Sequence, residues 1–346
     1  MAAIGLLDIP PEIQFQIAEF VETSKTLKAL SVTCRSLHSI AQSLLFEIFR
    51  IDLGIPLKGS IDDLLANPQI CAAIRDLEVG RFSLIHNNNE QLSLIQRLLP
   101  KLVRLRQVLI YRVTLSTAFT SSLLEIAAKI PLSFKLGSNV YPSGISSMSN
   151  APLRISHLSL GLFDQPSLDF YRTVFRASAA TLTKLNVTID GDGLMQLADI
   201  DLPCLHTLML LITGEYEISR KSAVAFLTVQ RATRKLDLRG KVCPLPPLPP
   251  SALPDLRELR GPTEVVNQLV PGRPVEVIEV STSRGSDRDW FGEEVTRSTT
   301  RVRKLRVHPK DAILKTRMVK RMVTITPYLE SLWLSVLADV SSPFAC

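Results

Sequence analysis

Apolar residues recur through most of the chain in one short pattern, in which the first, fourth and sixth positions are apolar. Clear copies stand at Leu205–Leu210 and Val302–Val307. Alternation over the last three positions is typical of a β-strand with one buried face. Between the copies, a helical period predicts helices over residues 90–99, 117–130, 167–180, 219–232 and 311–323. The pattern therefore predicts short strands that alternate with helices.

The fourth position of this pattern recurs at a nearly constant interval. The intervals run from 19 to 31 residues and centre on the mid-twenties, which is typical of leucine-rich repeats. These anchor positions are Leu77, Val108, Phe134, Leu158, Leu185, Leu208, Leu236, Leu259, Ile278, Leu305 and Leu332. One strand and one helix per repeat, stacked in parallel, would bury a continuous core. We expect an α/β leucine-rich-repeat solenoid, as an irregular horseshoe because the Asn that closes regular repeats is missing.

The first 50 residues have a different pattern, which predicts short helices. Pro10 and Pro11 suit the first turn of a helix, where their missing N–H groups cost little. An apolar stripe at spacings of three and four residues then runs from Leu27 to Leu44. Since no Gly or Pro occurs from Val21 to Arg50, we expect this stretch to be helical, with any break near residues 37–39. A unit of about 45 residues buries little surface and needs a partner or a neighbouring domain.

Three motifs in this region match one family of helical docking modules. They are Ile-Pro-Pro-Glu-Ile at residues 9–13, Leu-x-x-Leu-x-x-Thr-Cys-Arg-x-Leu at 27–37, and Leu-Phe at 45–46. Together they resemble the F-box, by which substrate receptors dock on the Skp-family adaptor of cullin–RING ubiquitin ligases. The chain departs from the family's Leu, Val, Trp and Trp at Ile9, Thr33, Leu37 and Phe46. As a whole it looks like the divergent F-box proteins of mushroom-forming fungi, which are basidiomycetes.

This resemblance implies a set of adaptor-binding residues and a division of the chain. The implied residues are Ile9, Pro10, Pro11, Glu12, Ile13, Ile17, Leu30, Cys34, Arg35, Leu37, Leu45 and Phe46. Residues 1–52 would form the F-box, 53–72 a linker or first repeat helix, and 73–346 the substrate-recognition repeats. The alternative is that the first helices merely cap the repeat array.

The positive charge of the chain is concentrated near its end. The formal net charge is +7, yet residues 297–321 alone hold ten Lys and Arg against one acid, Asp311. The rest of the chain carries 30 basic and 32 acidic residues. A globally basic surface that would steer the protein onto nucleic acid is therefore not expected.

Residues that stand between the apolar positions of each strand point away from the core and would line a recognition surface. We expect Asp237, Glu258 and Ser331 there. The candidate substrate-binding residues are Lys235, Arg239, Arg260, Lys304, Arg306, His308 and Trp333. Trp and Arg are enriched at binding hot spots, and the cations favour an acidic or phosphorylated target segment. There are two alternatives. Trp333 would pack under the C-terminal end of the chain, and the cations after residue 308 would lie on the solvent-exposed side of a helix.

Signals for other chemistry are weak. The five His have no metal-ligand spacing, and no nucleophile elbow, phosphate loop or dinucleotide fingerprint occurs. Asp190–Gly193 indicates a turn before it indicates a metal loop. The proline-rich stretch 243–254 is either a ligand for a proline-binding domain or, as we favour, a return loop that replaces a repeat helix. We expect no enzyme, no metal and no cofactor.

Five scattered Cys and an N-terminus without a basic region before its apolar residues predict a reduced protein of the cytoplasm or nucleus. No apolar stretch approaches the roughly 20 residues of a membrane span. The sequence thus predicts a substrate-recognition subunit of a Skp–cullin–F-box ubiquitin ligase. It would bind the Skp adaptor, through it a cullin, and an unknown protein substrate. The alternative is a repeat scaffold outside any ligase that binds protein or RNA.

Overall fold

The computed structural model describes most of the chain, with short gaps. The described residues are 9–21, 23–53, 58–80, 89–137, 141–142, 151–161, 168–214, 216–240, 245–281, 293–308 and 316–334. The chain divides into two compact units, Met1–Ser156 and His157–Cys346.

The first unit begins with three short helices, which we call the helical module. They are α1 (Pro11–Glu19), α2 (Ser24–Ser31) and α3 (Arg35–Leu45). Both α1 and α2 pack on α3. The side chain of Thr23 caps α2 by accepting a hydrogen bond from the backbone N–H of Thr26 (3.2 Å). The expected break near residues 37–39 is wrong: the helices separate at Val32–Cys34, and Cys34 stands in extended backbone before α3.

The rest of the first unit is a parallel sheet with connecting helices. Its strands β1 (Ile48–Asp52), β2 (Asp76–Gly80), β3 (Gln107–Tyr111) and β5 (Leu132–Leu136) pair in that order. The strands β4 (Thr114–Leu115) and β6 (Tyr141–Pro142) form a separate parallel pair. The helical elements are α4 (Lys58–Leu65), α5 (Pro68–Ala73), α6 (Asn89–Leu98), the 3-10 turn η2 (Leu99–Lys101) and α7 (Thr117–Lys129).

Strand β1 corrects the expectation that the chain stays helical as far as Arg50. The helix α3 ends at Leu45, and the carbonyl of Glu47 accepts backbone hydrogen bonds from Arg75 and Asp76, 2.9 Å each. Ile51 is buried against the repeat core. Absence of Gly and Pro permitted a helix here, but sheet pairing with β2 decided the conformation.

The second unit is also built on parallel strands. They are β7 (Ile155–Leu160), β8 (Lys184–Asp190), β9 (Thr207–Thr213), β10 (Lys235–Gly240), β11 (Glu258–Pro262), β12 (Val277–Ser281), β13 (Lys304–His308) and β14 (Ser331–Leu334). All adjacent pairs from β7 to β14 are parallel.

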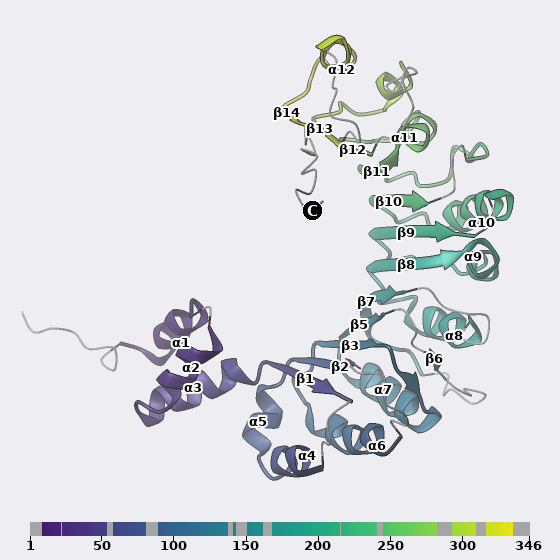
Figure 1. Ribbon diagram of the computed structural model, residues 1–346. Coiled ribbons are helices and arrows are strands. Elements are labelled where there is room, and N and C mark those ends of the chain that lie inside the picture. The colour runs from purple at the N-terminus through teal and green to yellow at the C-terminus, as the bar shows by residue number, and fades with distance from the viewer. Residues whose placement is uncertain are drawn as a thin grey trace, which may run out of the picture. The chain divides into compact units, whose positions relative to one another are not determined.

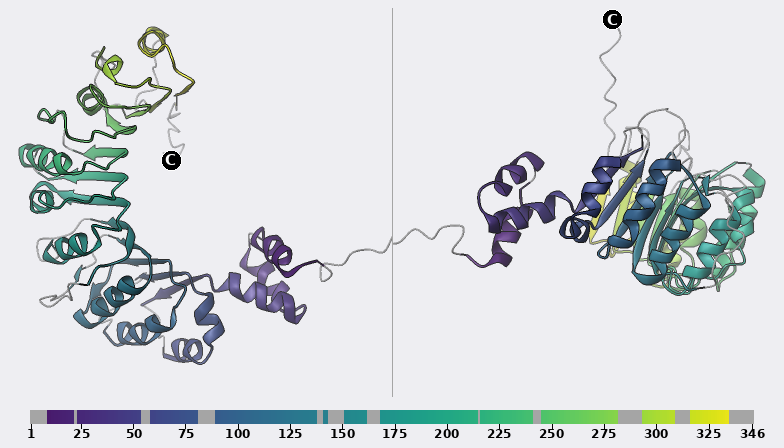
Figure 2. Two further views of the ribbon diagram at one scale, coloured as in Figure 1. Left: turned by 180° about the vertical axis from the view of Figure 1, so that it is seen from behind. Right: turned by 90° about the horizontal axis from the view of Figure 1, so that it is seen from below.

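Helices connect these strands. They are α8 (Leu168–Ser178), α9 (Gly191–Leu197), α10 (Tyr216–Val229), α11 (Thr263–Leu269), the 3-10 helix η4 (Glu293–Arg297) and α12 (Thr316–Ile325). In Figure 1, α9 and α10 lie on the same side of the β8–β10 sheet. Figure 2 shows the same layering from behind. The buried apolar core lies between the two layers.

The predicted repeat is confirmed by the register of the strands. Within each unit, every predicted anchor stands directly opposite the next: Leu77 with Val108 and Val108 with Phe134 in the first unit. In the second unit the aligned row is Leu158, Leu185, Leu208, Leu236, Leu259, Ile278, Leu305 and Leu332. One apolar ladder of this kind is the core of a solenoid. The chain therefore has the α/β leucine-rich-repeat fold that its periodicity predicts.

The predicted helices agree less evenly with the structure. Those near 90–99, 117–130 and 167–180 are α6, α7 and α8, while α10 begins three residues before the expected 219. The last one is α12 from Thr316, and residues 311–315 lie outside the described part. The Asp190–Gly193 turn is the start of α9, where the Asp190 carboxylate accepts a hydrogen bond from the Gly193 N–H (2.7 Å).

The proline-rich stretch is packed into the second unit as a return loop, as we favoured, over the residues from Leu245 on that the structure describes. Leu245, Ala252 and Leu253 are buried. The Gln268 side chain on α11 exchanges two hydrogen bonds with the backbone of Leu245, at 2.8 and 2.9 Å. The segment therefore covers the core between β10 and β11 where other repeats have a helix.

Candidate functional site

The helical module is held together from inside by a small core and one buried polar side chain. Ala18, Leu27, Leu37 and Ala41 fill the core. Gln14 is also buried, and its amide nitrogen donates to the carbonyl of Ile9 (2.9 Å) while its oxygen accepts from Ser36 Oγ (3.0 Å). These bonds satisfy the buried amide and fix α1 against the start of α3.

Because Gln14 and Ala18 occupy the inner side of α1, its large apolar side chains face outward. Ile13, Ile17 and Phe20, spaced at four and three residues, are 43, 45 and 85% exposed. We call these three residues the apolar docking face. Val32, at the end of α2, is 83% exposed as well. Exposed apolar residues gathered on one helix indicate an interaction surface rather than scattered surface residues.

The remaining predicted adaptor-binding residues take varied positions. Pro10, Pro11, Glu12 and Arg35 are exposed. Those that are half-buried are Ile9, Leu30, Cys34, Leu45 and Phe46. Leu37 differs from its expected place at the docking surface, because its position on α3 faces the module's own core.

The predicted substrate-binding residues all lie on neighbouring strands of the second unit, on the side opposite the buried ladder. We call the outward side chains of β10–β14 the strand face. Its central row aligns Asp237, Arg260, Glu279, Arg306 and Trp333 in register on five successive strands. A second row aligns Lys235, Glu258, Val277, Lys304 and Ser331. Sequence spacing alone therefore brought together side chains that are as much as 98 residues apart.

Two carboxylates organise the cations of the strand face. Asp237 is 5% exposed and accepts two hydrogen bonds from Arg239, at 2.8 and 2.6 Å, with Arg260 3.6 Å away. These hydrogen bonds raise the pKa of Arg239 above its ordinary value. Paired hydrogen bonds to a covered carboxylate fix the guanidinium plane far better than a solvated ion pair does.

Glu279 is the second organising carboxylate, and it is 14% exposed. Its oxygens lie 3.0 Å from Arg260, 3.8 Å from Arg306 and 2.9 Å from His308 Nε2. Both carboxylates therefore lie beneath a row of cationic side chains that is about half exposed. A row held in this way presents fixed N–H donors to a carboxylate or phosphate of a ligand.

Glu279 was not among the predicted site residues, although the strand pattern places it on the same face. The residue stands between Ile278 and Val280, the position that supplied Arg306 in the next repeat. Its presence changes the expected electrostatics, because the arginines are partly neutralised. The strand face is consequently a ladder of alternating charges with a cationic excess, and it is less basic than the cation list alone indicates.

The end of the ladder is aromatic. Trp333 is 62% exposed and stands in register with Arg306. Lys235 pairs with Glu258 on the next strand at 2.7 Å. A fixed charged row beside an exposed indole offers both polar specificity and apolar contact area, which are the two components of a protein-binding hot spot.

No family model matches the chain, and no curated protein does so. Among solved structures, the chain is similar to the leucine-rich repeat-containing protein LegL7 from Legionella pneumophila. The two share 13% identity with a TM-score of 0.45, over 81% of this chain and 97% of that one. It is also similar to TLR13 in its complex with ssRNA13, at 15% identity and a TM-score of 0.38, over 80% of this chain and 34% of that one.

The described residues were also searched for metal-binding clusters and for membrane-spanning helices. Within them, no cluster of three or more His, Cys, Asp or Glu side chains could hold a metal ion. Nor does any helix in those ranges combine the length and the apolar character that crossing a membrane requires.

Proposed function

We propose that the protein is the substrate-recognition subunit of a Skp–cullin–F-box ubiquitin ligase, acting in the cytoplasm or nucleus. The helical module docks on the Skp-family adaptor and through it on a cullin. The repeat units bind a target protein with the strand face. The protein performs no bond chemistry itself. It holds the target where the ligase's ubiquitin carrier reaches a lysine, so that an intermolecular reaction becomes effectively intramolecular.

The observation that carries this proposal is the apolar docking face on α1. A module of this size has too little interior to bury Ile13, Ile17 and Phe20, and it leaves them in solvent. Leaving them exposed is costly unless a partner covers them. The Ile-Pro-Pro-Glu-Ile motif stands at the start of the same helix, which supports an F-box adaptor as that partner.

Retention of a purified Skp-family adaptor by the immobilised full-length protein tests the proposal. We expect a stable complex that elutes as one species in size-exclusion chromatography. Failure of the wild-type chain to retain the adaptor would reject the ligase role. The helical module would then be a cap of the repeat array, and the chain a repeat scaffold for protein or RNA.

The strand face is proposed to select the target. Replacing both Arg306 and Trp333 by Ala should reduce capture of the target by roughly several hundredfold, because Arg and Trp anchors each contribute about 2 kcal/mol or more. Mass spectrometry of adaptor-dependent partners provides the measurement. Binding of the adaptor should be unchanged, since neither residue lies in the helical module.

The control variant replaces one exposed arginine and one exposed apolar residue that lie outside the strand face. Arg257 is exposed and pairs with Glu276 at 3.7 Å, and Val323 is exposed on α12. The variant with Arg257→Ala and Val323→Ala should capture the target normally. Undiminished capture by the Arg306→Ala and Trp333→Ala variant would place the target elsewhere on the repeats.

A further inference from the structure

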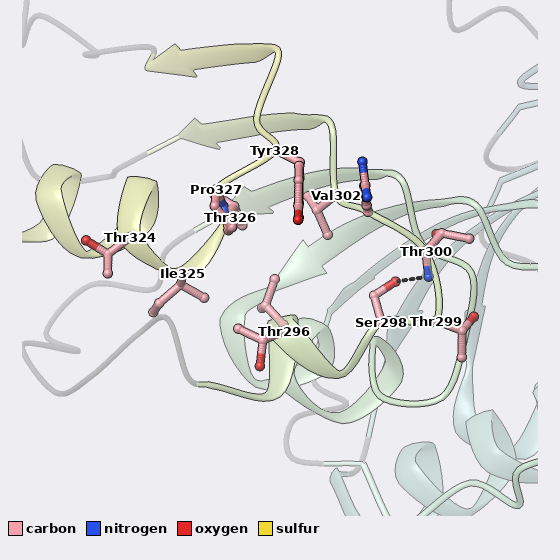
Figure 3. Close-up of a pocket in the computed structure, with 12 residues that line it drawn as sticks. Thr296, Ser298, Thr299, Thr300, Val302, Thr324, Ile325, Thr326, Pro327 and Tyr328 are labelled. Atoms are coloured by element: carbon pink, nitrogen blue, oxygen red, sulfur yellow. Dashed lines mark hydrogen bonds between the residues drawn. The ribbon is translucent and has the colours of Figure 1, made fainter.

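A second candidate site lies in the second unit, beside the starts of β13 and β14. It is a cavity of about 440 Å³, a volume within the range of small-molecule sites. One wall runs from Val295 to Val302, between η4 and β13, and the other from Thr324 to Tyr328, between α12 and β14. Figure 3 shows the labelled side chains of the two walls. None of them belongs to the strand face.

Hydrogen bonds hold the two walls in place. Ser298 Oγ lies 2.9 Å from the carbonyl oxygen of Arg273 and 3.0 Å from that of Val275, and it accepts from the N–H of Thr300 at 3.4 Å (Figure 3). On the opposite wall, both the N–H and the hydroxyl of Thr326 donate to the carbonyl of Met322, at 3.0 and 2.7 Å. The cavity is therefore built by the backbone of the repeat and is not a chance gap between mobile side chains.

The cavity carries a cation and hydroxyl groups but no acid. The Arg301 guanidinium carbon lies 4.0 Å from the centre of the Tyr328 ring. Stacking uses the face of a guanidinium and leaves its N–H edge available for hydrogen bonds. Within the described ranges, no carboxylate pairs with Arg301, whereas Arg303 pairs with Glu330 at 3.8 Å. The residues that line the cavity include no Asp or Glu.

The rest of the lining separates into a polar mouth and an apolar floor. Thr299 and Thr300 are exposed, and their hydroxyls make no hydrogen bond with other described residues. Val295 and Val302 are buried beneath them, and Ile325 is half-buried. A ligand that fits must therefore have an acceptor-rich anionic end and an apolar portion.

The charge of the surrounding chain favours the same ligand. Three exposed arginines, Arg297, Arg301 and Arg303, lie on or beside the wall formed by residues 295–302. A locally positive field raises the concentration of anions at the site.

We propose that this cavity binds a phosphate monoester carried on an apolar stem. The phosphate accepts from the free edge of Arg301 and from the hydroxyls of Thr299 and Thr300, and its three acceptor oxygens match that number of donors. The stem packs on the apolar floor. A carboxylate has one oxygen fewer and satisfies fewer donors. The site is independent of the adaptor and of the strand face.

Isothermal titration of the full-length protein with phenyl phosphate tests the proposal. We expect saturable binding at least about tenfold tighter than that of three comparison compounds. Inorganic phosphate lacks the apolar stem, benzoate lacks one acceptor oxygen, and phenol lacks the negative charge. A short phosphotyrosine peptide distinguishes the sources. Tighter binding of the peptide would assign the monoester to a protein side chain, and equal binding to a free small molecule; both support the site.

Two arginine variants separate a site from a diffuse positive field. Arg301→Gln should weaken phenyl phosphate binding by about tenfold or more, since a charge-assisted hydrogen bond is lost. Arg303→Gln removes the same charge two residues away, outside the lining, and should change binding less than about twofold. The Arg301→Lys variant keeps the charge but loses the planar set of N–H donors of the guanidinium, so it should also bind phenyl phosphate weakly. Both arginines are exposed, and unchanged melting temperatures would show intact folds.

Absence of saturable phenyl phosphate binding would overturn the proposal. Equal losses in the Arg301→Gln and Arg303→Gln variants would overturn it as well, because they would show long-range attraction without a site. Binding of inorganic phosphate as tight as that of phenyl phosphate would contradict the apolar stem.

Discussion

Replacing Ile13 and Ile17 together by Asp should abolish retention of the Skp-family adaptor, with affinity lowered by at least about a hundredfold. Both side chains belong to the apolar docking face and are nearly half exposed in the free protein. Covering them by a partner would bury most of their remaining apolar surface, and an Asp in each place would have to be desolvated without a counter-charge. Pull-down with purified adaptor, followed by titration calorimetry, measures the loss.

The fold should survive this double change, which keeps the experiment interpretable. Ile13 and Ile17 project from the side of α1 away from Gln14 and Ala18, so the module's core is untouched. Val103→Asp provides the control, because Val103 is 66% exposed in the same unit but lies outside the helical module. That variant should bind the adaptor normally. Full binding by the Ile13→Asp and Ile17→Asp variant would show that α1 is not the docking element.

The repeat architecture could be predicted from sequence because each copy carries its own signal. One copy of the short apolar pattern is weak evidence for a repeat. The pattern recurs at similar intervals from Leu77 to Leu332, however, and this recurrence is strong evidence. The strand register then follows, because parallel stacking of repeats places the same position of each repeat opposite that of the next. Even Phe134, the one aromatic residue among these anchors, stands opposite Val108 as expected.

Elements whose conformation depends on a neighbour were less predictable. Strand β1 precedes the first predicted copy of the repeat, so no interval pointed to it, and it is held by pairing with β2. Helices α9 and α11 have seven residues each, too few to show a helical period. Glycine near the start of α9 further masked that helix, although Asp190 is a favourable cap.

For the strand face, alternation predicted which side chains point outward but not how they pair. Arg260 and Arg306 were expected on this face, but their approach to Glu279, which comes from the strand between them, was not. Pairing across strands depends on three-dimensional register, which a single pattern does not show. The outward positions of Ile13 and Ile17 and the burial of Leu37 both depend on how three helices pack, which the spacing of apolar residues along one helix does not show.

Replacing Arg273 by Ala should destabilise the second unit by about 3–5 kcal/mol, lowering its melting temperature by roughly 10 °C. The side chain is 4% exposed. It donates to the carbonyls of Ala252 and Leu269, both at 3.0 Å, of Pro271 at 3.3 Å and of Pro249 at 3.4 Å. The guanidinium therefore joins the proline-rich return loop to the end of α11, and its burial lowers its pKa.

Prolines leave the return loop without the backbone donors that a helix would use to satisfy its own carbonyls. Removing Arg273 leaves those buried carbonyls without hydrogen-bond donors and leaves a cavity. The Arg273→Lys variant keeps the charge but has fewer donors in less suitable directions, so it should recover only part of the lost stability. Arg257→Ala is the matched control, because that arginine is 62% exposed and should cost less than about 1 kcal/mol. Thermal unfolding followed by circular dichroism compares all three variants. If Arg273→Ala melts like Arg257→Ala, the proline-rich loop is held by its buried Leu245 and Leu253 alone, and the hydrogen bonds of Arg273 contribute nothing beyond those available in water.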